Sequence, residues 1–228
     1  MQHTNFAPGV SSGMTDALLA ALIEADGTGS HAYVEKLCAS AADHGARPLA
    51  SLADAAHYLC LLHGRFPGVI DHAATRSTDN AARQWLVQAC EAFADERAYI
   101  TRVSVALGPV PSTFGQNNCD SAVLQQRHAL EMLSQSDRRG CAMGAALTLT
   151  LDWAGVRNLL DRAAIRAGIE PRKCSLPGRE ATLAVARAIA VDDASARAVL
   201  FGGRQLLHQH RGLWELMQAR ASVRAMEG

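Results

Sequence analysis

Residues that favour β-strands are scarce in this sequence. Aromatic side chains make up only 5% of its 228 residues. No segment alternates polar and β-branched apolar residues over the length of a strand. Alanine, the strongest helix former, instead occupies 43 positions. The composition therefore argues against a sheet-based fold and predicts an all-α protein.

Net charge and long apolar runs are also missing. Lys and Arg number 22, as do Asp and Glu, so no global field attracts nucleic acid or an anionic membrane. The most apolar window, Gly140 to Leu151, is well short of the ~20 residues that cross a bilayer. The first thirteen residues show neither the basic nor the apolar region of a signal peptide. We expect a soluble, cytoplasmic protein that binds neither nucleic acid nor membranes.

The six cysteines include no C-x-x-C pair, which argues against the common zinc knuckles and redox dithiols. They stand singly, mostly within Ala- and Leu-rich runs where a small buried residue fits. We interpret them as reduced packing residues of a cytosolic protein. The G-x-S-x-G turn of the α/β-hydrolases and a strand-linked phosphate-binding loop are missing too.

Apolar residues recur at helical spacing in nine segments, separated by Gly, Pro and capping residues. The predicted helices cover residues 15–26, 31–44, 48–66, 69–76, 80–107, 120–135, 137–167, 179–190 and 193–226. Residues 1–14 lack periodicity and are predicted to form a flexible N-terminal arm, and residues 15–228 a single all-helical domain. The clearest long loop, Gly108 to Asn118, is either a plain connector or a functional, lid-like loop.

Four stretches are long enough to span the domain: 48–76 taken together, 80–107, 137–167 and 193–226. With shorter helices around them, they predict a helical bundle, which resembles ferritin-like and haem-oxygenase-like architectures. Small residues from Gly140 to Ala146 would let a neighbouring helix approach closely. Gly202-Gly203 marks a place where the last helix can bend.

Each long stretch carries one polar side chain within its apolar stripe. These residues are His63, Glu96, Asp152 and His210. Helical spacing turns each of them toward the core, whereas His208 shares its face with charged residues. Two histidines and two carboxylates from four facing helices are typical ligands of iron, manganese or zinc. We predict a metal site there if the four side chains meet at one level. Glu96, Asp152 and His210 lie near the middle of their helices, whereas His63 lies late in its helix.

The Glu-x-x-His pair that defines di-iron carboxylate bundles does not occur, which argues against a symmetric di-iron centre. A single metal ion, or a haem ligated by one histidine, remains an alternative. The other interpretation is that these residues are core side chains satisfied by hydrogen bonds. A second candidate is the segment His63 to His72, where two histidines, Arg65 and Asp71 surround a Gly-Pro break. It is either a pocket lining or a kinked packing element.

Several segments together resemble a bacterial family of uncharacterised proteins. They are His63-Gly-Arg-Phe-Pro-Gly, Gln126-Arg-His-Ala-Leu-Glu-Met-Leu, Ser136-Asp-Arg-Arg-Gly-Cys-Ala and Leu151-Asp-Trp. The resemblance covers most of the chain after about residue 15 and implies no catalytic residue.

Because no catalytic motif is complete, we expect a ligand-binding or interaction protein that forms homodimers and takes a small-molecule ligand. The alternative is an oxidoreductase that depends on iron, manganese or haem, with its site in the bundle core at His63, Glu96, Asp152 and His210. A third hypothesis is a regulatory or scaffold module whose loop, Gly108 to Asn118, contacts a partner.

Overall fold

The computed structural model describes residues 14–42 and 45–227. Within them the chain forms α-helices and short 3₁₀ helices and no strand, which confirms the all-α prediction. The α-helices are α1 (Thr15–Asp26), α2 (Ala32–Ser40), α3 (Ala46–His63), α4 (Val69–Arg76), α5 (Arg83–Leu107), α6 (Gln116–Ser134), α7 (Cys141–Arg166), α8 (Arg179–Ile189) and α9 (Asp193–Glu227). The 3₁₀ helices are η2 (Thr28–Ser30) and η3 (Asn80–Ala82). Apart from Met14, the predicted N-terminal arm lies outside the described residues.

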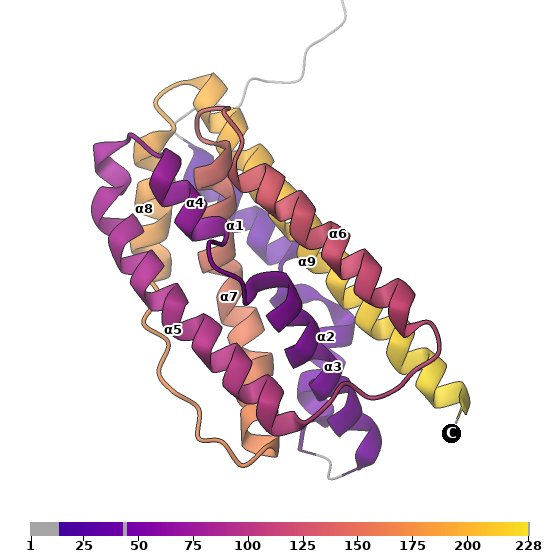
Figure 1. Cartoon of the computed structure of the whole chain (residues 1–228). Coiled ribbons are helices and arrows are strands. Elements are labelled where there is room, and N and C mark those ends of the chain that lie inside the picture. The colour runs from indigo at the N-terminus through magenta and orange to yellow at the C-terminus, as the bar shows by residue number, and fades with distance from the viewer. Residues whose placement is uncertain (1–13, 43–44, 228) are drawn as a thin grey trace, which may run out of the picture.

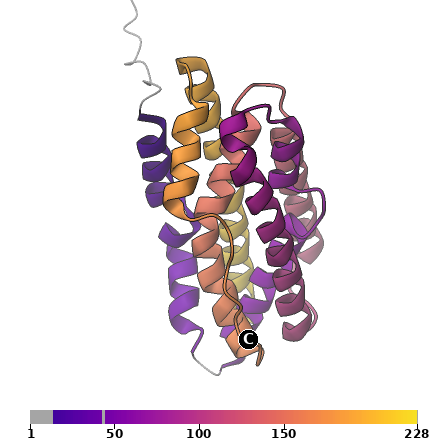
Figure 2. The same ribbon diagram turned by 90° about the vertical axis from the view of Figure 1, so that its left-hand side faces the viewer.

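The centre of the bundle is α7, which contacts each of the other eight α-helices. Figures 1 and 2 show it in the middle of the molecule, with α9 running beside it. Every residue from Cys141 to Trp153 is buried. A helix that is apolar on all sides is stable only when it is surrounded by other elements. The most apolar window of the sequence therefore forms the first half of the central helix.

Glycines bring α7 and α9 into backbone contact. A Cβ atom at Gly144 would lie 2.0 Å from the carbonyl oxygen of Val199, and one at Gly202 would lie 2.1 Å from that of Cys141. The close approach predicted for the small residues of α7 is thus confirmed. The glycines at 202 and 203 do not interrupt α9, which continues through them as one helix of 35 residues.

The long stretch predicted from 48 to 76 is broken in the middle. Helix α3 ends at His63, α4 begins at Val69, and Gly64, Pro67 and Gly68 lie between them. Proline lacks the amide hydrogen that a continuing helix needs, and it disfavours helical geometry in the preceding residue. Figure 1 shows that α3 consequently ends midway along the molecule.

Two predicted helix starts were wrong, each by four residues. Helix α6 begins at Gln116 rather than Asp120, directly after Gly115, and α7 begins at Cys141 rather than Asp137, directly after Gly140. Both glycines have positive φ, at 76° and 91°, which glycine adopts without strain. The sequence pattern placed the starts at side chains able to cap, whereas left-handed glycines determine them. Asp137 instead pairs with Arg76.

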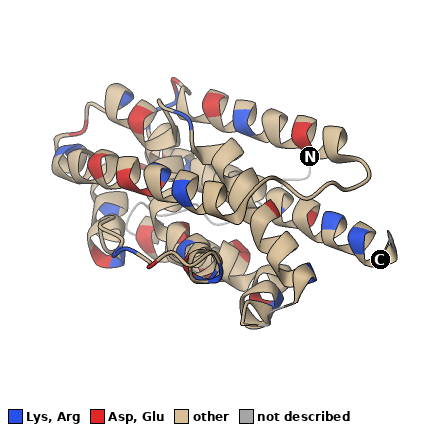
Figure 3. Ribbon diagram, turned by 60° about the horizontal axis from the view of Figure 1, so that its bottom comes forward, with Lys and Arg blue, Asp and Glu red and all other residues tan. Residues whose placement is uncertain are grey.

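The surface carries both signs of charge, interspersed along the helices (Figure 3). Within the described residues, none of the helices combines the length and the hydropathy that a bilayer span requires. The larger apolar side chains left exposed include Val105, Phe114 and Ile165, and they lie on different elements.

The α7–α9 contact predicts opposite effects for two glycines of α9. Gly202→Ala places a methyl group against the Cys141 carbonyl and should lower the free energy of unfolding by about 1–3 kcal/mol. In Gly212→Ala the new methyl group meets only the flexible end of Gln126, so this control should be neutral or more stable by up to about 1 kcal/mol. Urea unfolding followed by circular dichroism measures both. Equal stabilities would contradict the proposed contact.

Candidate functional site

Three of the four polar side chains predicted to face the core form one hydrogen-bonded series. His63 Nε2 lies 2.8 Å from His210 Nε2, and His210 Nδ1 lies 2.6 Å from Asp152 Oδ2. All three residues are buried, at 5%, 1% and 2% exposure respectively. We call Asp152, His210 and His63 the polar path. It crosses the core from α7 through α9 to the end of α3.

A short 3₁₀ turn fixes the carboxylate end of the polar path. The Thr28 backbone N–H donates to Asp152 Oδ1 at 2.6 Å, and the Thr28 hydroxyl donates to Asp152 Oδ2 at 2.6 Å. The indole N–H of Trp214 in turn donates to the Thr28 hydroxyl oxygen at 3.0 Å. A buried carboxylate is tolerated when donors surround it in this way. Thr28, in η2, therefore anchors a charge that lies at the centre of the bundle.

The protons of the polar path follow from its geometry. Asp152 Oδ2 is a carboxylate oxygen and accepts, so the facing Nδ1 of His210 carries a proton. The contact between the two Nε2 atoms requires one proton between them. Whichever ring holds that proton, His63 Nδ1 is the one ring nitrogen of the pair left without a hydrogen-bond partner among the described residues.

Two aromatic rings pack against the ring of His63. Its ring meets Trp153 edge-on at 5.6 Å between centroids and Phe93 at 6.3 Å. Burial lowers the pKa of His63 well below its ordinary value of 6.5, and the neighbouring His210 and Arg97 lower it further. The ring is therefore neutral at pH 7.

Glu96, the fourth predicted residue, is buried but belongs to a separate cluster. Its carboxylate accepts from the indole N–H of Trp153 at 2.8 Å and from Arg157 Nη1 at 2.9 Å. The Arg157 side chain also contacts the ring of Tyr99 and donates to Asp161. Glu96 is therefore a core residue whose carboxylate is satisfied by hydrogen bonds, as one of the two interpretations predicts. Its connection to the polar path runs through Trp153, which contacts His63.

The predicted metal ligands do not converge on one point in this arrangement. A tetrahedral ion with nitrogen ligands at ~2.0–2.1 Å holds those nitrogens more than ~3 Å apart, whereas the two Nε2 atoms are 2.8 Å apart. No group of three or more His, Cys, Asp or Glu side chains in residues 14–42 and 45–227 is placed to hold a metal ion. The metal site stays a prediction, and it requires the two rings to separate.

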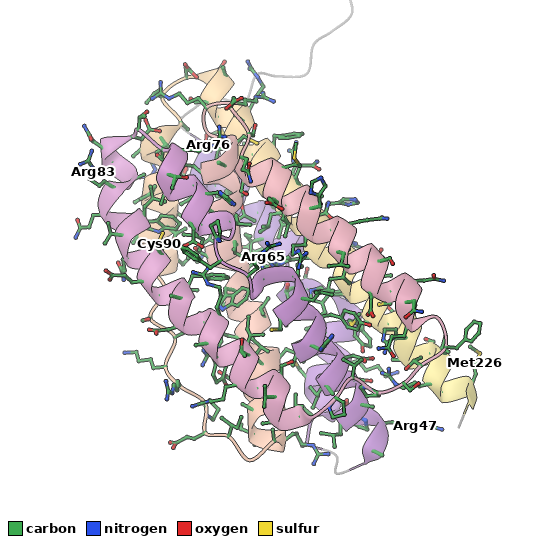
Figure 4. All side chains as sticks on the ribbon, in the orientation of Figure 1. Arg47, Arg65, Arg76, Arg83, Cys90 and Met226 are labelled. Carbon is green, nitrogen blue, oxygen red and sulfur yellow. The ribbon has the colours of Figure 1, made fainter. Side chains whose placement is uncertain are left out.

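A cavity of about 110 Å³ opens beside His63. We call it the His63 cavity. It lies between the α3–α4 break and α6, and its lining residues include Leu62, His63, Arg65, Phe66, Pro67, Gly68, Val69, His72, Arg127, Leu130 and Glu131. Figure 4 marks Arg65 at this junction. His63, Arg65 and His72 line the cavity, as the pocket-lining interpretation of this segment predicts, whereas Asp71 does not belong to the lining.

A buried ion pair holds the connection between α3 and α4 in place. Arg97 Nη1 donates to Asp71 Oδ2 at 2.8 Å, and that oxygen also accepts from the backbone N–H of Gly68 at 2.8 Å. The guanidinium of Arg97 lies 5.4 Å from the ring centroid of Phe66, at the cavity rim. The irregular backbone between α3 and α4 is thus fixed to α5 by charged hydrogen bonds, which are stronger than neutral ones.

The loop predicted as a functional loop is tied to the rest of the bundle. Arg220 Nη2 donates to the carbonyl oxygen of Pro111 at 3.1 Å and to the hydroxyl of Thr113 at 3.4 Å. Arg220 and Arg224 both pair with the fully buried carboxylate of Asp54. Phe114, beside these contacts, keeps 84% of its side chain exposed.

Sequence reasoning found the members of the polar path but not their partners. Thr28, which holds the carboxylate of Asp152, lies 124 positions from it along the chain, and no local pattern marks it as a partner. One available signal was Trp214, since a buried indole N–H requires an acceptor.

The lowered pKa of His63 predicts an acid-sensitive fold. The unfolded chain protonates this histidine as the pH falls through about 6.5, whereas the folded protein keeps it neutral. The unfolded state then binds more protons, so the free energy of unfolding falls below that pH, by up to about 1.4 kcal/mol per pH unit from this group.

Urea unfolding at several pH values between about 8 and 5 measures this slope. His63→Gln should reduce it, whereas His72→Gln, which changes a half-buried histidine at the cavity wall, should keep it. The same slope in the wild type and in His63→Gln would contradict the assignment.

The family comparison agrees with the resemblance seen in the sequence. No curated protein and no solved structure matches the chain significantly. A family model matches residues 23–225, which is most of the chain and includes the polar path and the His63 cavity. The protein therefore belongs to the DUF6975 family, a family of unknown function.

Proposed function

We propose that this protein binds a small-molecule ligand in the His63 cavity. The observation that carries the proposal is that a buried polar path, starting at Asp152, ends on a side chain that lines a cavity. Small-molecule sites are typically concave and mostly apolar, with a few well-positioned polar groups. A histidine whose other nitrogen is already engaged offers one ring nitrogen to a ligand in a fixed orientation.

A larger hollow on the surface supports a site less well. It measures about 500 Å³ and lies between residues 73–79 and 136–143. Its charged side chains include the pairs Arg76–Asp137 and Arg139–Asp79, in which each charge already has a partner. All four of these side chains are at least partly exposed, and exposed pairs position a ligand weakly. The His63 cavity is smaller, but its histidine is fixed by the core.

The state of the cysteines supports ligand binding without a covalent bond to a cysteine thiol. All six are free thiols. Burial raises the pKa of the Cys38, Cys119, Cys141 and Cys174 thiols, and it raises that of Cys90 to about 11. A thiol with a raised pKa remains protonated near neutral pH and is a poor nucleophile. Free thiols also agree with the predicted cytoplasmic location, which stays a prediction, as does the homodimer.

Chemical-shift mapping tests the proposed site. ¹H–¹⁵N spectra are recorded while small acids, amides, alcohols and amines are added, each about the size of four water molecules. Shifts should concentrate on the amides of Gly64, Gly68 and Leu130, around the His63 cavity. Binding should weaken at least about fivefold in His63→Gln, which removes the oriented ring nitrogen.

His57→Gln is the matched control, since His57 is an exposed histidine of the same helix outside the cavity. It should bind like the wild type. Shifts that gather on another part of the surface, or equal affinities for the two variants, would refute the site.

A metal- or haem-dependent oxidoreductase with its site in the bundle core is the second candidate. It is favoured by one observation, the meeting of His63, His210 and Asp152 in the core. Elemental analysis and a visible spectrum of protein purified without a metal-affinity step test it. Iron or manganese near one equivalent, or a haem band, that is lost in His210→Ala and kept in His208→Ala would establish the second candidate in place of the first. His208 is the matched control because it is an exposed histidine on the same helix.

A further inference from the structure

The His63 cavity holds more positive than negative charge. Arg65 and Arg127 line it from opposite sides, one on the α3–α4 connection and the other on α6. Neither guanidinium has an ion pair or a hydrogen bond within the described residues. Glu131 is the one acidic side chain in the lining. Two cations against one anion leave an excess of one positive charge.

The partial burial of Arg127 strengthens its attraction for an anion in the cavity. Its side chain is half-buried, unlike that of Arg65, which is exposed. A guanidinium near low-dielectric walls interacts more strongly with an anion than one in open water does. Its planar array of N–H donors also matches the two oxygens of a carboxylate. Arg127 is therefore the side chain best placed to hold an anionic group in the cavity.

The remaining walls are apolar. Leu62, Val69 and Leu130 are buried residues of three helices, and Phe66 lies at the rim. The volume of about 110 Å³ equals that of roughly four water molecules. A fully hydrated inorganic anion would leave these walls without partners, whereas a short hydrocarbon tail would cover them. The cavity combines an anionic subsite with an apolar one.

From these features we propose that the ligand of the His63 cavity is a small carboxylate with a short apolar tail, of about the size of butyrate. Arg127 and Arg65 hold the carboxylate, and the tail lies against Leu62, Val69 and Leu130. His63 Nδ1 donates its N–H to the carboxylate, which places the proton shared by the two rings on His210 Nε2. This assignment rests on the proposed function, because it requires that the cavity is the binding site.

Titrations with three probes test the ligand class. Binding is measured from the chemical shifts of the amides around the His63 cavity. Butyrate is compared with butyramide, which has the same shape without the charge, and with inorganic phosphate, which has charge without a tail. Butyrate should bind at least about tenfold more tightly than either. Its affinity should fall as salt is added, because one of the two arginines is exposed.

Variants of single arginines locate the charge. Arg127→Gln should weaken butyrate at least about tenfold and leave butyramide unchanged. Arg204→Gln is the matched control: it removes an exposed arginine of α9 that lies outside the cavity, and it should bind butyrate like the wild type. Circular dichroism confirms that both variants fold, and Arg65→Gln replaces Arg127→Gln if the latter does not.

The outcomes separate the ligand class from the site. If butyramide shifts the cavity amides as strongly as butyrate does, the carboxylate assignment is wrong and the binding site stands. Tighter binding of phosphate would also overturn the assignment, in favour of a phosphorylated ligand. If Arg127→Gln and Arg204→Gln bind butyrate equally, Arg127 is not the anion contact. If none of the three probes shifts these amides, the carboxylate assignment fails. The site fails as well if none of the acids, amides, alcohols and amines shifts them.

Discussion

The buried carboxylate of Asp152 is the constraint on which the interior of this protein depends. A charge at the centre of a helical bundle is costly unless donors surround it, and here the donors come from η2 and α9. Meeting this requirement brings together segments that are more than a hundred residues apart, since Thr28 and Asp152 are separated by 124 positions. One carboxylate thus fixes how the N-terminal part of the chain, the central helix and the last helix sit against one another.

Backbone contact between α7 and α9 supports the same arrangement. Glycines at 144 and 202 let the two helices pack without side chains between them. At that separation His210, further along α9, lies within hydrogen-bonding distance of Asp152 on α7. The apolar and polar contacts are therefore not independent, because the close packing sets the geometry that the buried hydrogen bonds require.

The sequence predicted the helices and the inward-facing polar residues because both follow from local periodicity. An apolar stripe shows that His63, Glu96, Asp152 and His210 turn toward the core, and all four are buried. Which of them meet is not a local property. Glu96 faces Arg157, whereas His63 reaches His210 because Gly64 and Pro67 end α3 midway along the bundle. Partners such as Thr28 depend on how distant segments pack, which local periodicity does not reveal.

The hydrogen bond from the Thr28 amide has a consequence for solvent exchange. Amides in short 3₁₀ turns usually exchange quickly, because small local openings expose them to water. Thr28 is 1% exposed and its amide donates to the buried carboxylate of Asp152, so water reaches this amide only when η2 separates from α7. The exchange rate of one amide in a short turn therefore reports on the contact between that turn and the central helix.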